Sequence, residues 1–200
     1  MALPSILLLL AFVGAVFMTS IFALVLGVGN ERLDDNQQLG GVLAALSGAL
    51  AAGAAWLHWN RFKVPITVAA GAASVSAIAI GLLFAALGQD LEAVRDLVLG
   101  FVLLLGIGVF TVAMRWDSSD PARLTRRSDV AFWLHLLAAP MIVHPVFTLL
   151  GLNDGNASIG EGLVVVLLYV IIGVTALAID RRALLVSALA YVLWALSDLF

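Results

Sequence analysis

The chain has 200 residues, of which 63% are hydrophobic and 12% are charged, and its formal net charge is −3 at pH 7. Thirteen acidic and ten basic residues are too few to cover a compact water-soluble protein of this size, so lipid must replace water over most of the surface. The absence of cysteine excludes disulfides, thiol nucleophiles and cysteine-ligated metals. Because no basic segment is interleaved with aromatic residues, we expect membrane lipid as a partner and no nucleic acid.

Seven apolar runs are long enough for a membrane-spanning helix, which needs about 20 residues. They cover residues 5–29, 39–59, 64–87, 97–114, 130–152, 162–179 and 183–200. The separators are short and polar, which is typical of antiparallel neighbouring helices. We therefore predict an all-α fold: a polytopic transmembrane helix bundle of about seven helices, in a single integral membrane domain of residues 1–200.

Small residues line the second and third predicted spans at helical spacing. One row is Gly41, Ala45, Ala49 and Gly53, beside a parallel row that starts at Gly40, and the third span has Ala69, Ala73, Ala77 and Gly81. Small side chains let helix backbones approach closely in a membrane. We expect these two spans to pack as a tight hairpin.

The longest separator, between the fourth and fifth spans, contains Asp120-Pro121. An acid before a proline is placed to cap a short turn, and Ser128 or Asp129 can cap the fifth span. We expect this separator to hold an interfacial helix of about two turns.

Basic residues alternate between the loops in chain order. Eight of the ten lie in the even-numbered loops: Arg61, Lys63, Arg115, Arg123, Arg126, Arg127, Arg181 and Arg182. The positive-inside bias then places these loops and the N-terminus in the cytoplasm. Trp56, Trp59, Trp116 and Trp133 fall near the same boundary, where indoles are favoured.

The fifth span has two histidines and two prolines, His135, Pro140, His144 and Pro145. Each proline frees a backbone carbonyl one turn earlier, so this span is predicted to be kinked or broken. Broken spans often line binding sites, which makes these four residues the candidate substrate-binding set. The alternative is a plain proline kink with each histidine satisfied by neighbouring backbone.

Histidine is the ionisable residue type that remains within the spans, and it suits a transition metal. In an intact helix His135 and His144 lie on opposite faces and about 13.5 Å apart, too far to share one ion. His58 and His135 are the better pair for a metal or a haem, if the second and fifth spans are neighbours. No carboxylate completes an evident site, so we expect no bound cofactor.

The sequence contains no catalytic motif such as Gly-x-Ser-x-Gly or His-Glu-x-x-His, and no Asp, Glu, Lys or Arg in the middle of a span. We therefore expect a protein without catalytic activity of its own: an accessory subunit or homo-oligomer, or a binding or transport-type bundle. A membrane enzyme that binds metal or haem through His58, His135 and His144 is the alternative. Nine arginines against one lysine, with abundant Ala and Gly, favour a bacterial inner membrane as its location.

Overall fold

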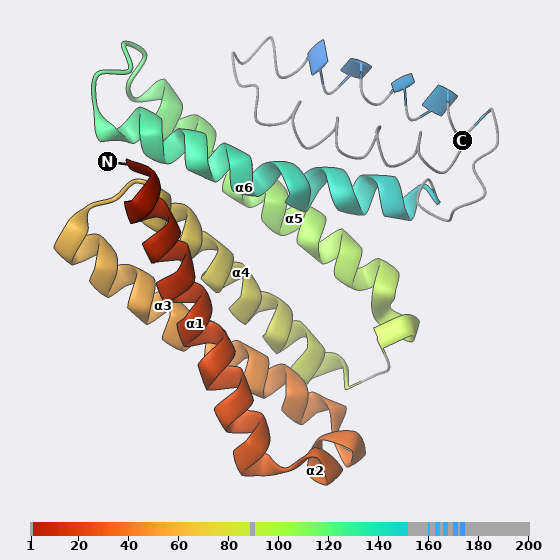
Figure 1. Ribbon diagram of the computed structural model, residues 1–200. Helices are drawn as coiled ribbons and strands as arrows, with labels where there is room; N and C mark the ends of the chain where they lie inside the picture. Colours follow the sequence, from red (N-terminus) through yellow and green to blue (C-terminus); the bar gives the residue numbers. More distant parts are fainter. Residues whose placement is uncertain are drawn as a thin grey trace. The chain divides into compact units, whose positions relative to one another are not determined.

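The computed structural model describes residues 2–88 and 91–151, together with single positions between 160 and 174. Six helices are defined in it (Figure 1): α1 (Ala2–Val28), α2 (Asn30–Asp35), α3 (Gln37–Phe62), α4 (Ile66–Leu87), α5 (Leu91–Ser118) and α6 (Arg126–Leu149). No strand occurs among the described residues. The all-α class predicted from the sequence is therefore confirmed for this part of the chain.

Five of these helices contain stretches of 22 to 25 residues that are long and apolar enough to cross a membrane. At about 1.5 Å per residue these stretches are about 33–38 Å long, against a hydrocarbon core of about 30 Å. They coincide with the first five predicted spans, in α1, α3, α4, α5 and α6. The sixth predicted span, 162–179, is described only at scattered positions, and the seventh, 183–200, lies outside the described residues. The total of seven and the cytoplasmic N-terminus stay predictions.

The chain divides into two compact units, residues 1–98 and 99–200. In the first unit α3 and α4 form a hairpin, and α1 packs mainly against α3 (Figure 1). The turn between α3 and α4 is tight because Lys63 adopts a left-handed φ of 54° and its N–H donates to the carbonyl of Trp59 at 3.0 Å. Pro65, the N-cap residue directly before α4, has φ −55°, a value that proline favours and that suits the start of a helix.

Glycines set the distance between α3 and α4. A Cβ atom added to Gly41 would lie 2.6 Å from the carbonyl oxygen of Gly81, and one added to Gly81 would lie 2.6 Å from the amide nitrogen of Ala45. Gly48 approaches the carbonyl of Ser74 in the same way, at 3.1 Å. The predicted tight hairpin is therefore confirmed, and both rows contribute to the contact, one through Gly41 and the other through Gly48. A Cβ atom added to Gly40 itself would meet nothing within 4 Å outside its own helix.

In the second unit a short loop joins α5 to α6, and Asp120 organises it. Its carboxylate accepts hydrogen bonds from the Thr125 hydroxyl at 2.7 Å and from the amides of Thr125 and Leu124 at 2.9 and 3.2 Å. These bonds, the Thr125 hydroxyl first, hold the pKa of Asp120 below its usual value, although burial acts in the opposite direction. The prediction that Asp120 caps a turn here is confirmed.

Two other expectations for this loop are wrong. It contains turns and no interfacial helix, because α5 continues to Ser118 and leaves few residues before α6 begins. The N-cap of α6 is Thr125, whose hydroxyl accepts from the Arg127 amide at 3.2 Å, instead of Ser128 or Asp129. Ser128 adds a hydrogen bond from its hydroxyl to the Thr125 carbonyl at 3.1 Å.

The fifth span was expected to be kinked or broken; the break is wrong, and the kink stays a prediction. α6 runs as one helix from Arg126 to Leu149 with Pro140 and Pro145 inside it. Pro140 is exposed and Pro145 is buried, so the two rings lie in different surroundings. Close packing supports α6 here, since a Cβ atom added to Gly106 of α5 would lie 2.9 Å from the Met141 side chain. Contact with a neighbouring helix can hold a proline-containing span together when two of its own hydrogen bonds are missing.

Candidate functional site

His58 lies in the last turns of α3 and is fixed by a neighbour on α4. Its Nδ1 atom is 3.1 Å from the hydroxyl oxygen of Thr67, which is 1% exposed. The tight turn between the two helices brings these residues together, because His58 is one turn before the end of α3 and Thr67 is the second residue of α4. The hydrogen bond sets the orientation of the imidazole and leaves its Nε2 atom without a partner among the described residues.

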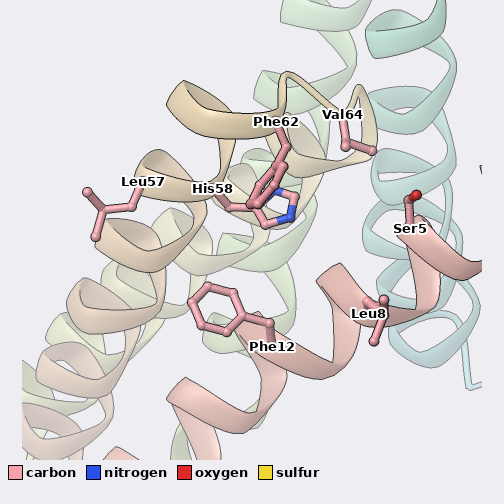
Figure 2. A pocket seen from close by; sticks show the side chains of 7 residues that line it. All are labelled: Ser5, Leu8, Phe12, Leu57, His58, Phe62 and Val64. Carbon is pink, nitrogen blue, oxygen red and sulfur yellow. The ribbon is translucent and has the colours of Figure 1, made fainter.

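Aromatic side chains surround the same imidazole. The ring centroid of Phe62 lies 4.7 Å from that of His58, and the centroid of Phe12 from α1 lies 6.3 Å away. Figure 2 shows the imidazole beside Phe62, with Phe12, Leu8 and Ser5 placed along α1 on the other side of the pocket. A histidine in such a setting is held by packing on its faces and by Thr67 at one edge.

These side chains line a pocket of about 480 Å³ (Figure 2), which we call the His58 pocket. Its lining is Ser5, Leu8, Phe12, Leu57, His58, Phe62 and Val64. Pockets for small molecules usually measure about 300–1,000 Å³ and combine an apolar wall with a few fixed polar groups. The His58 pocket has this composition, with the imidazole and the Ser5 hydroxyl as its polar side chains.

Two cations lie near the His58 pocket. The guanidinium carbon of Arg61 is 5.6 Å from the centroid of the Phe62 ring, and the Lys63 ammonium is 5.3 Å from the Trp59 ring. Both distances fall within the range of a cation–π interaction. The end of α3 therefore combines an apolar pocket with positive charge close to one of its walls.

The predicted site in the fifth span is arranged differently from the expectation. His135 is 0% exposed, whereas His144 is exposed, and the two are nine residues apart on an unbroken helix. His135 Nδ1 is 2.7 Å from the carbonyl oxygen of Ala131 one turn earlier. The hydroxyl of Thr148 donates to the His144 carbonyl at 2.9 Å. The structure thus gives His135 and His144 opposite surroundings, and substrate binding by the four residues of this span stays a prediction.

The two residues of the predicted metal pair belong to different units of the chain. His58 belongs to residues 1–98 and His135 to residues 99–200. Among the described residues, no group of three or more His, Asp or Glu side chains is placed to hold a metal ion. Metal or haem binding by His58 and His135 together stays a prediction.

The sequence reasoning missed most of the His58 pocket, because it treated His58 as a possible metal ligand or an interfacial residue. Thr67 could have been found, since a short turn after residue 62 places it at nearly the same depth as His58. Phe12, Leu8 and Ser5 carry no such signal, because their contact with α3 depends on where α1 packs. Comparison of the chain with protein-family models, with curated proteins and with solved structures found no match.

Proposed function

We propose that this chain is a non-enzymatic, multi-pass protein of a bacterial inner membrane that binds a lipid-soluble small molecule in the His58 pocket, as a binding or transport-type helix bundle. The ligand has an apolar body and a head with a hydrogen-bonding oxygen, as quinones and long-tailed phenols have. One observation carries the proposal: a single imidazole, oriented by Thr67, stands in an almost wholly apolar pocket of about 480 Å³.

The chemistry of the pocket supports this ligand class. The apolar wall favours the body of the ligand, and the Nε2 atom of His58 supplies one directional contact for the head. With Nδ1 as a hydrogen-bond acceptor from Thr67, Nε2 carries the proton and donates to a carbonyl oxygen. With Nδ1 as the donor, Nε2 accepts from a phenol. Nearby Arg61 and Lys63 favour an oxygen that bears partial negative charge.

The position of the pocket supports access from the lipid. Leu8, Leu57 and Phe62 are 71%, 61% and 61% exposed, although all three line it. The positive-inside bias assigns this end of α3 to the cytoplasmic interface, where amphipathic molecules accumulate with their heads toward water. A ligand dissolved in the bilayer would therefore reach His58 head first.

Binding of a short-tailed quinone to the purified protein in lipid nanodiscs tests the proposal. Quinones quench tryptophan fluorescence, and Trp59 follows His58 directly in the chain. We expect saturable quenching that weakens about two- to tenfold in His58→Ala, which is the loss of one neutral hydrogen bond. Leu8→Trp adds bulk at an exposed position of the pocket wall and should weaken binding further, which equilibrium dialysis measures because this variant adds a tryptophan to the pocket.

His144→Ala is the matched control, because it removes an exposed histidine from the second unit. It should bind the quinone as the parent protein does. The proposal is overturned if the parent protein shows no saturable binding, or if His58→Ala and Leu8→Trp both bind as tightly as the parent. Equal weakening in His144→Ala would also contradict it, because the effect would then not be specific to the pocket.

The four residues predicted in the fifth span are a second candidate location for binding or transport by this bundle. Pro140 and His144 are both exposed on α6. If they contact a transported molecule after it leaves the His58 pocket, His144→Ala or Pro140→Ala changes uptake into vesicles, while insertion and equilibrium binding of the quinone stay as in the parent. Unchanged uptake in both variants would remove this site from consideration.

An accessory subunit and a stand-alone carrier differ in what purifies with them. Large apolar side chains are exposed along the described helices, and these surfaces face lipid, a partner subunit or a second copy of the chain. Purification in mild detergent distinguishes these cases. A stoichiometric second membrane protein supports the subunit role, and the chain alone supports the stand-alone role.

A further inference from the structure

The buried side chain of His135 faces a sulfur atom instead of a hydrogen-bond donor. His135 on α6 is 0% exposed, and its Nε2 atom lies 3.4 Å from the Sδ atom of Met114 on α5. Phe110, one turn before Met114, places its ring at right angles to the imidazole with 5.2 Å between the centroids. All of these residues belong to the second unit, so this cluster is separate from the His58 pocket.

The positions of the protons on the imidazole follow from its neighbours. The Nδ1 atom is 2.7 Å from the carbonyl oxygen of Ala131, and a carbonyl only accepts, so Nδ1 carries a hydrogen and donates it. In a neutral imidazole the Nε2 atom is then a bare lone pair. The thioether of Met114, a half-buried residue, also offers only lone pairs, so two acceptors face each other.

A cation bound between the Nε2 atom of His135 and the Sδ atom of Met114 would give both lone pairs a partner. A second proton on the imidazole would place a full charge inside the membrane, which is costly without an anionic neighbour. The ring contacts that the structure describes are a carbonyl, a thioether and an aromatic ring, none of which carries a full negative charge. A metal ion bonded to both lone pairs would use the neutral form of the imidazole.

We propose that His135 and Met114 form a binding site for a soft monovalent metal ion, Cu(I). Thioether and imidazole ligands suit cuprous copper, and the absence of a charged ligand favours a monovalent over a divalent ion. The hydrogen bond from Nδ1 to Ala131 is the outer contact that commonly fixes a metal-binding histidine.

The separation of the two atoms is compatible with one ion bound to both. With about 2.0 Å from metal to nitrogen and about 2.3 Å to sulfur, the observed N···S separation of 3.4 Å corresponds to an angle of about 104° at the metal. This is close to a tetrahedral angle, so both atoms can bind the same ion. His58 is not needed, which changes the partner expected for His135 from a second histidine to a methionine.

The site lies near one end of its helices. Met114 is four residues before the end of α5 and His135 is nine residues after the start of α6. At about 1.5 Å per residue these distances are about 6 and 13.5 Å. An ion that enters from the loop between α5 and α6 therefore travels only a few helical turns.

Competition for Cu(I) between the purified protein and a chromogenic chelator, under anaerobic reducing conditions, tests the proposal. We expect the parent protein to withdraw one Cu(I) per chain from the chelator. Met114→Leu keeps the volume of the side chain but removes the thioether, and should lower the affinity at least tenfold. Met114→Cys restores a sulfur ligand and should regain binding.

Met18→Leu serves as the matched control for general copper binding. It removes a methionine that is 55% exposed on α1 by the same Met-to-Leu change. This variant should bind Cu(I) as the parent does. The proposal is overturned if the parent withdraws no Cu(I), or if Met114→Leu binds as tightly as Met18→Leu.

X-ray absorption of the copper-loaded parent protein decides the matter if Met114→Leu does not fold. A sulfur scatterer at about 2.3 Å together with imidazole nitrogen supports the site, and a shell without sulfur refutes it. The proposed quinone pocket lies in the other unit. His58→Ala should therefore weaken quinone binding alone, and Met114→Leu should weaken copper binding alone, so that either proposal can fail while the other holds.

Discussion

Replacement of Gly81 by alanine should destabilise the first unit, because the added Cβ atom clashes with the backbone of α3. The added Cβ atom would lie 2.6 Å from the amide nitrogen of Ala45 and 2.8 Å from the carbonyl oxygen of Gly41. Ordinary contact at such a position is 3.4–4 Å. α3 and α4 must therefore separate by about 0.6–0.8 Å, and forced changes of this kind in a packed interior cost about 1–3 kcal/mol.

Gly71→Ala is the matched control on the same helix. Its Cβ atom would be 3.8 Å from the Cβ atom of Ala55, which is ordinary contact. Alanine is a better helix former than glycine by up to about 1 kcal/mol, so this variant should be as stable as the parent or more stable. The two substitutions are chemically identical, and the difference between them isolates the clash.

Reversible unfolding in mixed micelles of a mild detergent and SDS gives the measurement. We expect the free energy of unfolding of Gly81→Ala to fall about 1.5–4 kcal/mol below that of Gly71→Ala. A double variant with Gly41→Ala should cost less than the two single costs added, because both Cβ atoms force the same separation. Equal stability of Gly81→Ala and Gly71→Ala would refute the reasoning.

Three further predictions concern the loop, the pocket and the topology. The pKa of Asp120 is lower in the folded state than in the unfolded state. Its ionised carboxylate therefore stabilises the fold at pH values above the usual aspartate pKa, and this stabilisation is lost as the pH falls through the lowered pKa. Asp120→Asn should thus lower the melting temperature at neutral pH, with the difference from the parent shrinking in acid, whereas exposed Asp129→Asn should change little. Thr67→Val should cost about 0.5–1.5 kcal/mol in stability and weaken quinone binding, and an unchanged titration would contradict its role in orienting the imidazole. Since the chain has no cysteine, a membrane-impermeant thiol reagent should label Ser119→Cys from the cytoplasmic side and Asn36→Cys from the other side; labelling of both from one side would contradict the assigned orientation.

The spans were predictable because a bilayer imposes one strong requirement on the sequence. Every backbone polar group in hydrocarbon needs an internal partner, so an apolar run of sufficient length becomes a helix. Helix ends were less predictable. α5 begins at Leu91 and ends at Ser118, beyond both limits of the predicted span 97–114, because polar residues can extend a helix into the interface without changing its apolar centre.

The expected break at the prolines was wrong because a neighbouring helix was not considered. The rule that proline removes a hydrogen bond and crowds the preceding turn describes an isolated helix. α6 continues through Pro140 and Pro145 beside α5, where Met141 packs against Gly106. Sequence alone shows the lost bonds but not the neighbour that supports the helix.

The sequence by itself determined that this is an all-α chain with at least five membrane-spanning candidates, and that α3 and α4 approach through small residues. These properties depend on local composition and on spacing within one helix. Tertiary structure alone decided that Phe12 closes the pocket at His58 and that Met114 faces His135. Such contacts join side chains from different helices, and their formation depends on how the helices rotate and shift against one another, which no pattern within a single helix specifies.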